Sequence, residues 1–171
     1  DALRQRLSFA ARMQADTPRA LALAAAAHAL ALSADAVAAA ADGSPHAPAA
    51  ITDEEKAGLV RALPADTPEH IQADLPDWMA PLLARVFPGG MVAEGQALAR
   101  RAPVDLRVNT LKADRDKLLA ALARHDAVAT PHSAVGVRIP APEGAGRTPN
   151  VESETAHGKG WFEVQDLGPR R

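Results

Sequence analysis

The spacing of hydrophobic residues changes from a helical to a strand period part-way along the chain. Leu106, Val108 and Thr110 alternate with Arg107 and Asn109. A period of two residues is typical of a strand with one face in the core and one in solvent. The sequence therefore predicts a short strand here, with Arg107 and Asn109 on its solvent face and the other three residues toward the core.

Before this strand, the pattern predicts a series of helices whose starts carry capping residues. Thr17 precedes Pro18, Ser33 opens another apolar run, and Thr52 with Glu55 has the spacing of a capping box. The predicted helices, which end where proline, glycine or a change of pattern interrupts them, span residues 3–13, 17–32, 33–42, 52–63, 77–87 and 91–101.

The helix predicted from Asp77 carries the aromatic residues Trp78 and Phe87. Both are expected to anchor a core, because large aromatics at helical spacing are usually buried. An exposed aromatic binding face is the alternative. The segments before this helix, residues 43–50 and 64–76, are rich in proline and are expected to be a loop and a connector.

After the strand, the pattern predicts a small mixed domain. A helix should start at Asp114 and present Leu118, Leu119 and Leu122 on one side. The segments that follow read as a strand over 128–139 interrupted by proline and glycine, a mobile loop over 143–160 and a final strand over 161–165. We therefore expect a mainly α domain at residues 1–101 and a small α+β domain at residues 102–171.

Composition narrows the class of protein. The chain has 41 alanines and 3% aromatic residues, which predicts thin, closely packed helices, and it has no cysteine. Disulfides, zinc–thiolate sites and thiol nucleophiles are thereby excluded. The sequence shows neither a signal peptide nor an apolar run that could span a bilayer, so a cytoplasmic location is expected. Because the first residue is Asp1 and the end is abrupt, we also expect a fragment of a longer protein.

Charge is unevenly distributed along the chain. Residues 35–94 hold ten acidic and three basic residues, whereas residues 100–138 hold eight basic and four acidic ones. The second region is compatible with phosphate contacts, and it is equally compatible with an ordinary solvated surface.

Motifs for catalysis or metal binding are not evident in the sequence. The six histidines lack helical pairing and acidic partners at metal-ligand spacing, so they are expected to be surface or incidental residues. They are His28, His46, His70, His125, His132 and His157. The glycines at 144–146 and 158–160 lack the contexts of a dinucleotide fingerprint and of a phosphate loop. We therefore predict no catalytic residue and no metal ligand in this chain.

Three segments of the second half occur in a characteristic order. They are Leu75–Met79 before a helix ending at Phe87, Leu106–Lys112 before a leucine-rich helix, and Gly160–Asp166. In combination they resemble the Fmu/Sun (RsmB-like) RNA cytosine-5 methyltransferases over about residues 75–168. The resemblance implies a NusB-like helical region in the first part of the chain, followed by part of a ferredoxin-like or RRM-like domain.

The same resemblance implies that the chemistry lies elsewhere. In that family the chain continues into a Rossmann-type domain that binds S-adenosylmethionine, where a cysteine attacks the cytosine ring. A chain without cysteine cannot supply that nucleophile, and its tail, Leu167–Arg171, departs from the family pattern. No cofactor is therefore expected in this segment, S-adenosylmethionine belonging to the parent enzyme.

Some residues are assigned possible roles by the resemblance. Arg107, Asn109 and Lys112 match positions of a domain on the RNA side of the family, and Arg115 extends the same positive surface. These four residues are predicted to contact phosphate or ribose of ribosomal RNA. The alternative, weighted equally, is that Asn109 caps a turn and Arg107 contacts the absent catalytic domain. Two further residues expected to border that domain are Gln165 and Asp166.

Two functions follow as hypotheses. The first is the RNA-positioning N-terminal region of an S-adenosylmethionine-dependent rRNA (cytosine-5) methyltransferase, a monomer whose partners are ribosomal RNA and its own C-terminal catalytic domain. The second is a free-standing helical module that binds protein or RNA without catalysis, using the acidic surface of residues 35–94.

Overall fold

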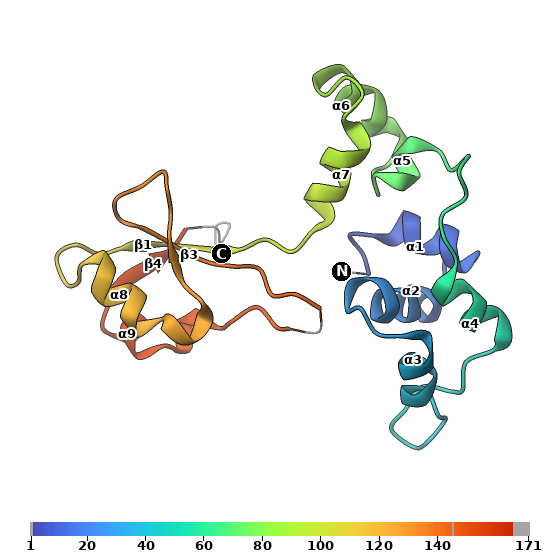
Figure 1. Ribbon diagram of the computed structural model, residues 1–171, viewed down its shortest axis with the longest axis horizontal. Helices are drawn as coiled ribbons and strands as arrows, with labels where there is room; N and C mark the ends of the chain where they lie inside the picture. The colour runs from blue at the N-terminus through green and yellow to red at the C-terminus, as the bar shows by residue number, and fades with distance from the viewer. Residues whose placement is uncertain (1, 145, 166–171) are drawn as a thin grey trace. The chain divides into compact units, whose positions relative to one another are not determined.

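The protein consists of two compact units, which are residues 1–100 and residues 101–171 (Figure 1). The computed structural model describes residues 2–144 and 146–165. The first unit is helical, and the second combines strands and helices. The expected order of a mainly α part before an α+β part is therefore confirmed.

The helical unit is built from short helices joined by turns and loops. Its elements are α1 (Arg6–Met13), α2 (Pro18–Ala24), the π-helical turn η1 (Ala25–Ala29), α3 (Ala34–Ala40), α4 (Asp53–Val60), α5 (Glu69–Gln72), the 3-10 turn η2 (Asp77–Met79), α6 (Ala80–Val86) and α7 (Met91–Ala99).

The predicted capping residues begin these helices. The Thr17 hydroxyl accepts a hydrogen bond from the Ala20 N–H, and Ser33 caps α3 in the same way. Thr52 and Glu55 form the complete capping box, in which each side chain accepts a hydrogen bond from the backbone of the other, at 3.1 and 2.9 Å. Because these bonds satisfy N–H groups that have no partner inside the helix, they fix where each helix starts.

Two apolar clusters hold the helical unit together. The larger one gathers side chains of α1, α2, α3 and α4 around Phe9. The smaller one consists of Ala73, Leu75 and Met91, and it joins α5 to α7. At Gly95 an added Cβ would lie 2.5 Å from the carbonyl oxygen of Ala73, so the absence of a side chain allows α7 to approach α5 closely.

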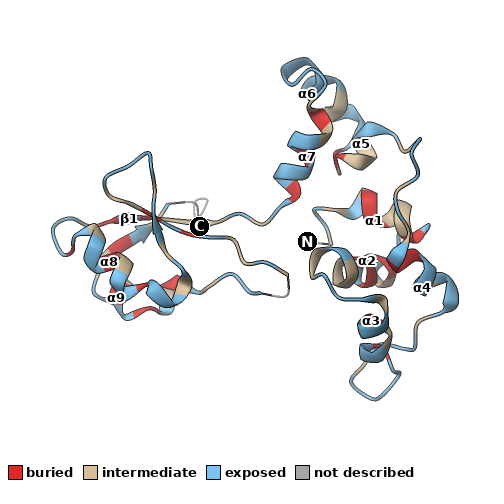
Figure 2. Cartoon of the chain, in the orientation of Figure 1, coloured by how far each residue is buried: buried red, intermediate tan, exposed pale blue. Residues whose placement is uncertain are grey.

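The aromatic residues of the η2–α6 region are not core anchors. Trp78 is 66% exposed and Phe87 is 41% exposed, and α6 contains no buried residue (Figure 2). Asp77 lies inside η2 and accepts a hydrogen bond from the Trp78 N–H, while α6 begins only at Ala80. The expected burial of both aromatics is therefore wrong. The proline-rich connector also proves to contain α5.

The second unit has a four-stranded antiparallel sheet. Its elements are β1 (Val104–Val108), α8 (Arg115–Ala121), the 3-10 turn η3 (Ala123–His125), β2 (Val128–Ala129), β3 (Gly136–Ile139), the 3-10 turn η4 (Val151–Ser153), α9 (Thr155–Gly158) and β4 (Phe162–Val164). The strand order is β2-β3-β1-β4, and every pair is antiparallel. With one helix after β1 and another before β4, this is the β-α-β-β-α-β arrangement of ferredoxin-like domains.

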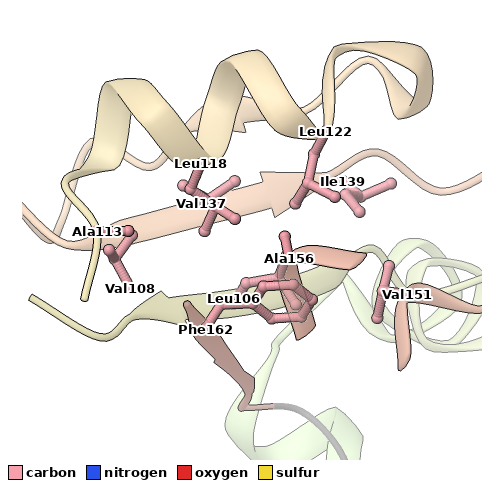
Figure 3. Close-up of a cluster of buried hydrophobic side chains, with 10 residues drawn as sticks. All are labelled: Leu106, Val108, Ala113, Leu118, Leu122, Val137, Ile139, Val151, Ala156 and Phe162. Atoms are coloured by element: carbon pink, nitrogen blue, oxygen red, sulfur yellow. The ribbon is translucent and has the colours of Figure 1, made fainter. Parts of the chain in front are cut away.

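One face of the sheet is covered by the two helices. Leu118 of α8 and Leu122, which directly follows this helix, point toward Val137 and Ile139 of β3 (Figure 3). The same buried cluster also contains Leu106, Val108 and Phe162 of the strands and Ala156 of α9. All of its members lie within this unit. The alternation predicted for β1 is confirmed at Leu106 and Val108.

Two details of the second unit differ from the prediction. β1 ends at Val108, and Thr110 is exposed instead of facing the core. The segment expected to be a mobile loop over 143–160 contains η4 and α9, and it contributes Val151 and Ala156 to the core. Each of these single helical turns contributes one buried residue to the core. One residue is too few to show a periodic pattern in the sequence.

Candidate nucleic-acid interface

The open face of the sheet, opposite α8 and α9, carries two ion pairs between neighbouring strands. Asp105 of β1 lies opposite Arg138 of β3 and accepts two hydrogen bonds of 2.6 Å from its guanidinium. Arg107 lies opposite Glu163 of β4, at 2.7 Å. Bonding to Arg138 lowers the pKa of the Asp105 carboxyl. These four residues balance one another in charge, so the positive character predicted for this strand is largely compensated where Arg107 lies.

Asn109 closes the turn that follows β1. Its Oδ1 accepts a hydrogen bond from the Leu111 N–H at 3.2 Å, and its Nδ2 donates to the Gly160 carbonyl at 3.0 Å. The side chain of Leu111 is 93% exposed on this turn. Asn109 therefore has the turn-capping geometry of the alternative role, and its contact with RNA stays a prediction.

A shallow hollow of about 380 Å³ lies at this end of the strand. It is lined by residues from both sides of the turn and from two neighbouring segments, namely Arg107, Val108, Asn109, Thr110, Leu111, Val135 and Glu163. Two of the predicted RNA-contacting residues, Arg107 and Asn109, thus share one surface.

The two remaining predicted RNA contacts lie just beyond the turn. Lys112 is exposed, and its ammonium extends beside Gly160, where an added Cβ would be 2.8 Å from Nζ. Arg115, in the first turn of α8, donates a hydrogen bond of 3.3 Å to the Ser133 carbonyl. The backbone N–H of Gln165 donates to the Asp105 carbonyl and extends the pairing of β4 with β1, while its side chain is exposed. Asp166 lies outside the described residues.

A group around Trp161 was missed by the sequence reasoning. The Nζ atoms of Lys117 and Lys159 lie 4.2 and 5.0 Å from the centre of the indole ring. Such distances are those of a cation–π interaction. The residues are separated by up to 44 positions in the sequence, so only the conspicuous Gly-Trp step after Lys159 could have drawn attention to this cluster.

Glu154, which precedes α9, connects this part of the chain to the 3-10 turn η3. Its side chain is only 9% exposed, and one of its oxygens contacts both the Arg124 guanidinium and His125 Nε2, the latter at 2.7 Å. These bonds, that from Arg124 first, lower the pKa of the Glu154 carboxyl. The expectation that the histidines are incidental is therefore wrong for His125, whose acidic partner is distant in sequence. Within the described residues, no group of three metal-ligating side chains is found.

Comparison with known proteins decides which family the second unit and the end of the first resemble. The family model for the ferredoxin-like domain of RsmF/B-like methyltransferases matches residues 75–143. Residues 75–143 are thus similar to the ferredoxin-like domain of this family. The resemblance predicted from the three sequence segments is thereby confirmed, and Arg107, Asn109, Lys112 and Arg115 all lie in the matched range.

Similarity to an RsmF/B-like relative extends over more of the chain. The ribosomal RNA small subunit methyltransferase B of Sodalis glossinidius (strain morsitans) is 33% identical over 121 residues, which are 70% of this chain and 24% of the relative. The chain thus spans about a quarter of the length of that protein. A solved structure, titled "Crystal Structure of PH0851", matches with a TM-score of 0.48 and 17% sequence identity. The match covers 66% of this chain and 28% of the chain in that structure. In the part of the chain that the structure describes, no helix is long and apolar enough to cross a membrane.

Proposed function

We propose that this chain is the RNA-positioning N-terminal region of an S-adenosylmethionine-dependent rRNA (cytosine-5) methyltransferase. The observation that carries the proposal is the match of residues 75–143 to the RsmF/B-like ferredoxin-like domain. The name of the relative from Sodalis glossinidius supports ribosomal RNA as the substrate. In this proposal, methyl transfer and cofactor binding belong to a catalytic domain that acts on the RNA held by this region.

The described geometry suggests how the second unit could hold RNA. Among the residues that the structure describes, the strands present no stacking aromatic on the open face, since Phe162 of β4 faces the core. Lys112 and Arg115 lie next to the turn after β1, where Lys112 is exposed and Arg115 donates a hydrogen bond to the Ser133 carbonyl. Cationic donors in such positions suit contacts with the phosphate backbone, which set the position of RNA without reading its sequence.

Replacing both Lys112 and Arg115 by alanine should weaken RNA binding and reduce its salt dependence. Each lost phosphate contact lowers the slope of log K against log salt by about 0.7 to 0.9, because fewer counterions are released on binding. The double variant should therefore show a slope smaller by about 1.4 to 1.8. Filter binding of a small-subunit rRNA fragment at several salt concentrations measures both quantities.

A matched control removes two positive charges from the helical unit. Lys56, which pairs with Asp35 at 2.8 Å, and the exposed Arg85 can be replaced by alanine together. This control should change the slope less than the double variant at Lys112 and Arg115. Equal salt slopes for the wild type, the double variant and the control would show that Lys112 and Arg115 do not contact RNA phosphates. A wild-type chain that binds no RNA would favour the free-standing module that binds a protein.

Because the proposal places cofactor binding in a catalytic domain, we predict that this chain alone does not bind S-adenosylmethionine. Isothermal calorimetry with the 171-residue protein should give no binding heat at micromolar concentrations of the cofactor. The positive control is a full-length RsmF/B-like enzyme under the same conditions. Clear micromolar affinity of the short chain would place the cofactor site within these residues and contradict the proposal.

A further inference from the structure

The indole of Trp161 holds two lysine side chains at one place on the second unit. Lys117 belongs to α8, and Lys159 follows α9, yet both ammonium groups lie within 5.0 Å of the ring centre. Trp161 itself is half-buried and packs against the core of this unit. The ring therefore gathers two positive charges from different segments at one place before any ligand is bound.

Neither of these two lysines has a carboxylate partner in the described part of the chain. The neighbouring arginines are paired, Arg107 with Glu163 and Arg124 with Glu154. Among residues 2–144 and 146–165, no carboxylate lies within ion-pair distance of the Lys117 or Lys159 ammonium. Two positive charges without a carboxylate partner in the described residues are therefore gathered at Trp161, apart from Lys112 and Arg115, and they favour an anionic ligand.

A hollow of about 260 Å³ opens beside the indole. Its walls combine the aromatic ring and small side chains with charged groups, and they include Ala121, Arg124, Glu154, Ala156, Lys159 and Trp161. The alanines leave room against the ring, and the exposed guanidinium of Arg124 offers donors at the edge. An aromatic ring, small side chains and cations around one hollow are the features that accept an unstacked base and its phosphate.

We propose that this hollow binds one unpaired nucleotide of an RNA strand. The base stacks on the Trp161 indole in place of the two ammonium groups, and Lys117 and Lys159 turn from the ring to the flanking phosphates. The inference rests on the proposed function for its RNA ligand, and it adds a contact site distinct from Lys112 and Arg115. A base inside a duplex is stacked and paired, so its ring face cannot reach the indole. The site therefore selects single-stranded over double-stranded RNA.

Fluorescence of Trp161 tests the site directly. In a Trp78→Phe background Trp161 is the only tryptophan of the chain, and a base stacked on its ring should quench it. Titration with a short oligouridylate should give saturable quenching, and the same length of RNA duplex should give much less. Equal quenching by single-stranded and duplex RNA, or none with either, would overturn the proposal.

Two variants separate the roles of the ring and of the lysines. Lys117→Gln with Lys159→Gln should lower the salt slope of oligouridylate binding by about 1.4, at 0.7 per phosphate contact. Trp161→Leu should weaken binding about 5- to 150-fold, the range for loss of one stacked base. Trp161→Phe keeps an aromatic ring and should retain most of the affinity. Circular dichroism establishes that each variant folds, and the exposed lysine pair decides the outcome where Trp161→Leu does not fold.

The results also distinguish this site from the proposed function. If quenching depends on the two lysines and the variant at Lys112 and Arg115 binds rRNA as the wild type does, nucleotide binding in the hollow is supported. The same result contradicts the phosphate contacts of Lys112 and Arg115. If the variant at Lys112 and Arg115 loses rRNA binding while Trp161→Leu and the lysine-pair variant have no effect, the proposed function is supported. Nucleotide binding in the hollow is then contradicted. Lys56→Gln is the charge-matched control and should leave quenching unchanged.

Discussion

Phe162→Ala should unfold the second unit at a much lower urea concentration than the wild-type protein requires. Phe162 is 2% exposed and packs among Leu106, Ala156 and other core residues of this unit. Removing a buried aromatic ring costs about 3 to 5 kcal/mol, because apolar burial is lost and a cavity remains. The core of so small a unit has few other large side chains, so the loss is a large part of its stability.

The two tryptophans allow each unit to be followed separately. Trp161 reports on the second unit in a Trp78→Phe background, and Trp78 reports on the helical unit in a Trp161→Phe background. The Phe162→Ala midpoint should fall for Trp161, while the midpoint for Trp78 should hardly move, since the two units have separate apolar cores. Leu111→Ala, at a site 93% exposed, is the control and should change stability by less than about 0.5 kcal/mol. A parallel fall of both midpoints would show that the units unfold together.

Local patterns were sufficient to predict most of the elements. Caps at Thr17, Ser33 and Thr52 act within three residues of themselves, so their helices could be located from the sequence alone. The alternation at Leu106 and Val108 likewise reports a local property of a strand with one buried face.

Where prediction failed, the deciding contacts are tertiary. Thr110 follows the alternating pattern, but the strand stops earlier because the Asn109 side chain closes a turn against Gly160, which is distant in sequence. Trp78 and Phe87 have helical spacing, yet the apolar cluster beside them is formed by Ala73, Leu75 and Met91. Periodicity indicates which residues could share a face, and it does not indicate which face finds a partner.

The candidate site shows the same limit for charge. The sequence indicated an excess of basic residues around β1, and the pairing of Arg107 with Glu163 and of Arg138 with Asp105 could not be read from it. Only the register of β1 with β3 and β4 brings these partners together. Once those pairs are formed, Lys117 and Lys159 are among the cations that have no carboxylate partner in the described part of the chain, so a phosphate contact is favoured beside Trp161 more than on the strand face at Arg107.

Glu154→Gln should destabilise the second unit at neutral pH by about 1.5 to 3 kcal/mol. The carboxylate is 9% exposed and accepts charge-assisted hydrogen bonds from Arg124 and contacts His125 Nε2. Such bonds contribute about this amount, and a neutral amide forms weaker ones. Urea unfolding followed by Trp161 fluorescence in the Trp78→Phe background measures the difference.

The effect should depend on pH in one direction. The pKa of the Glu154 carboxyl is lower in the folded protein than its usual value, because Arg124 and then His125 bond to the charged form. Its contribution is therefore complete above the pKa of the unfolded chain, about 4.3, and is lost as pH falls through the lower folded value. The wild type and Glu154→Gln should differ fully at about pH 7 and converge toward about pH 3.

Asp126→Asn provides the matched control for this carboxylate. Asp126 ends η3 in the left-handed conformation, with φ of 55°, which asparagine adopts as readily as aspartate. Its side chain makes no hydrogen bond or ion pair with the described residues. Its replacement should change stability little at either pH. A Glu154→Gln difference that persists undiminished at low pH would mean that the carboxylate stabilises the unit by packing and not through its charge, because packing does not depend on protonation.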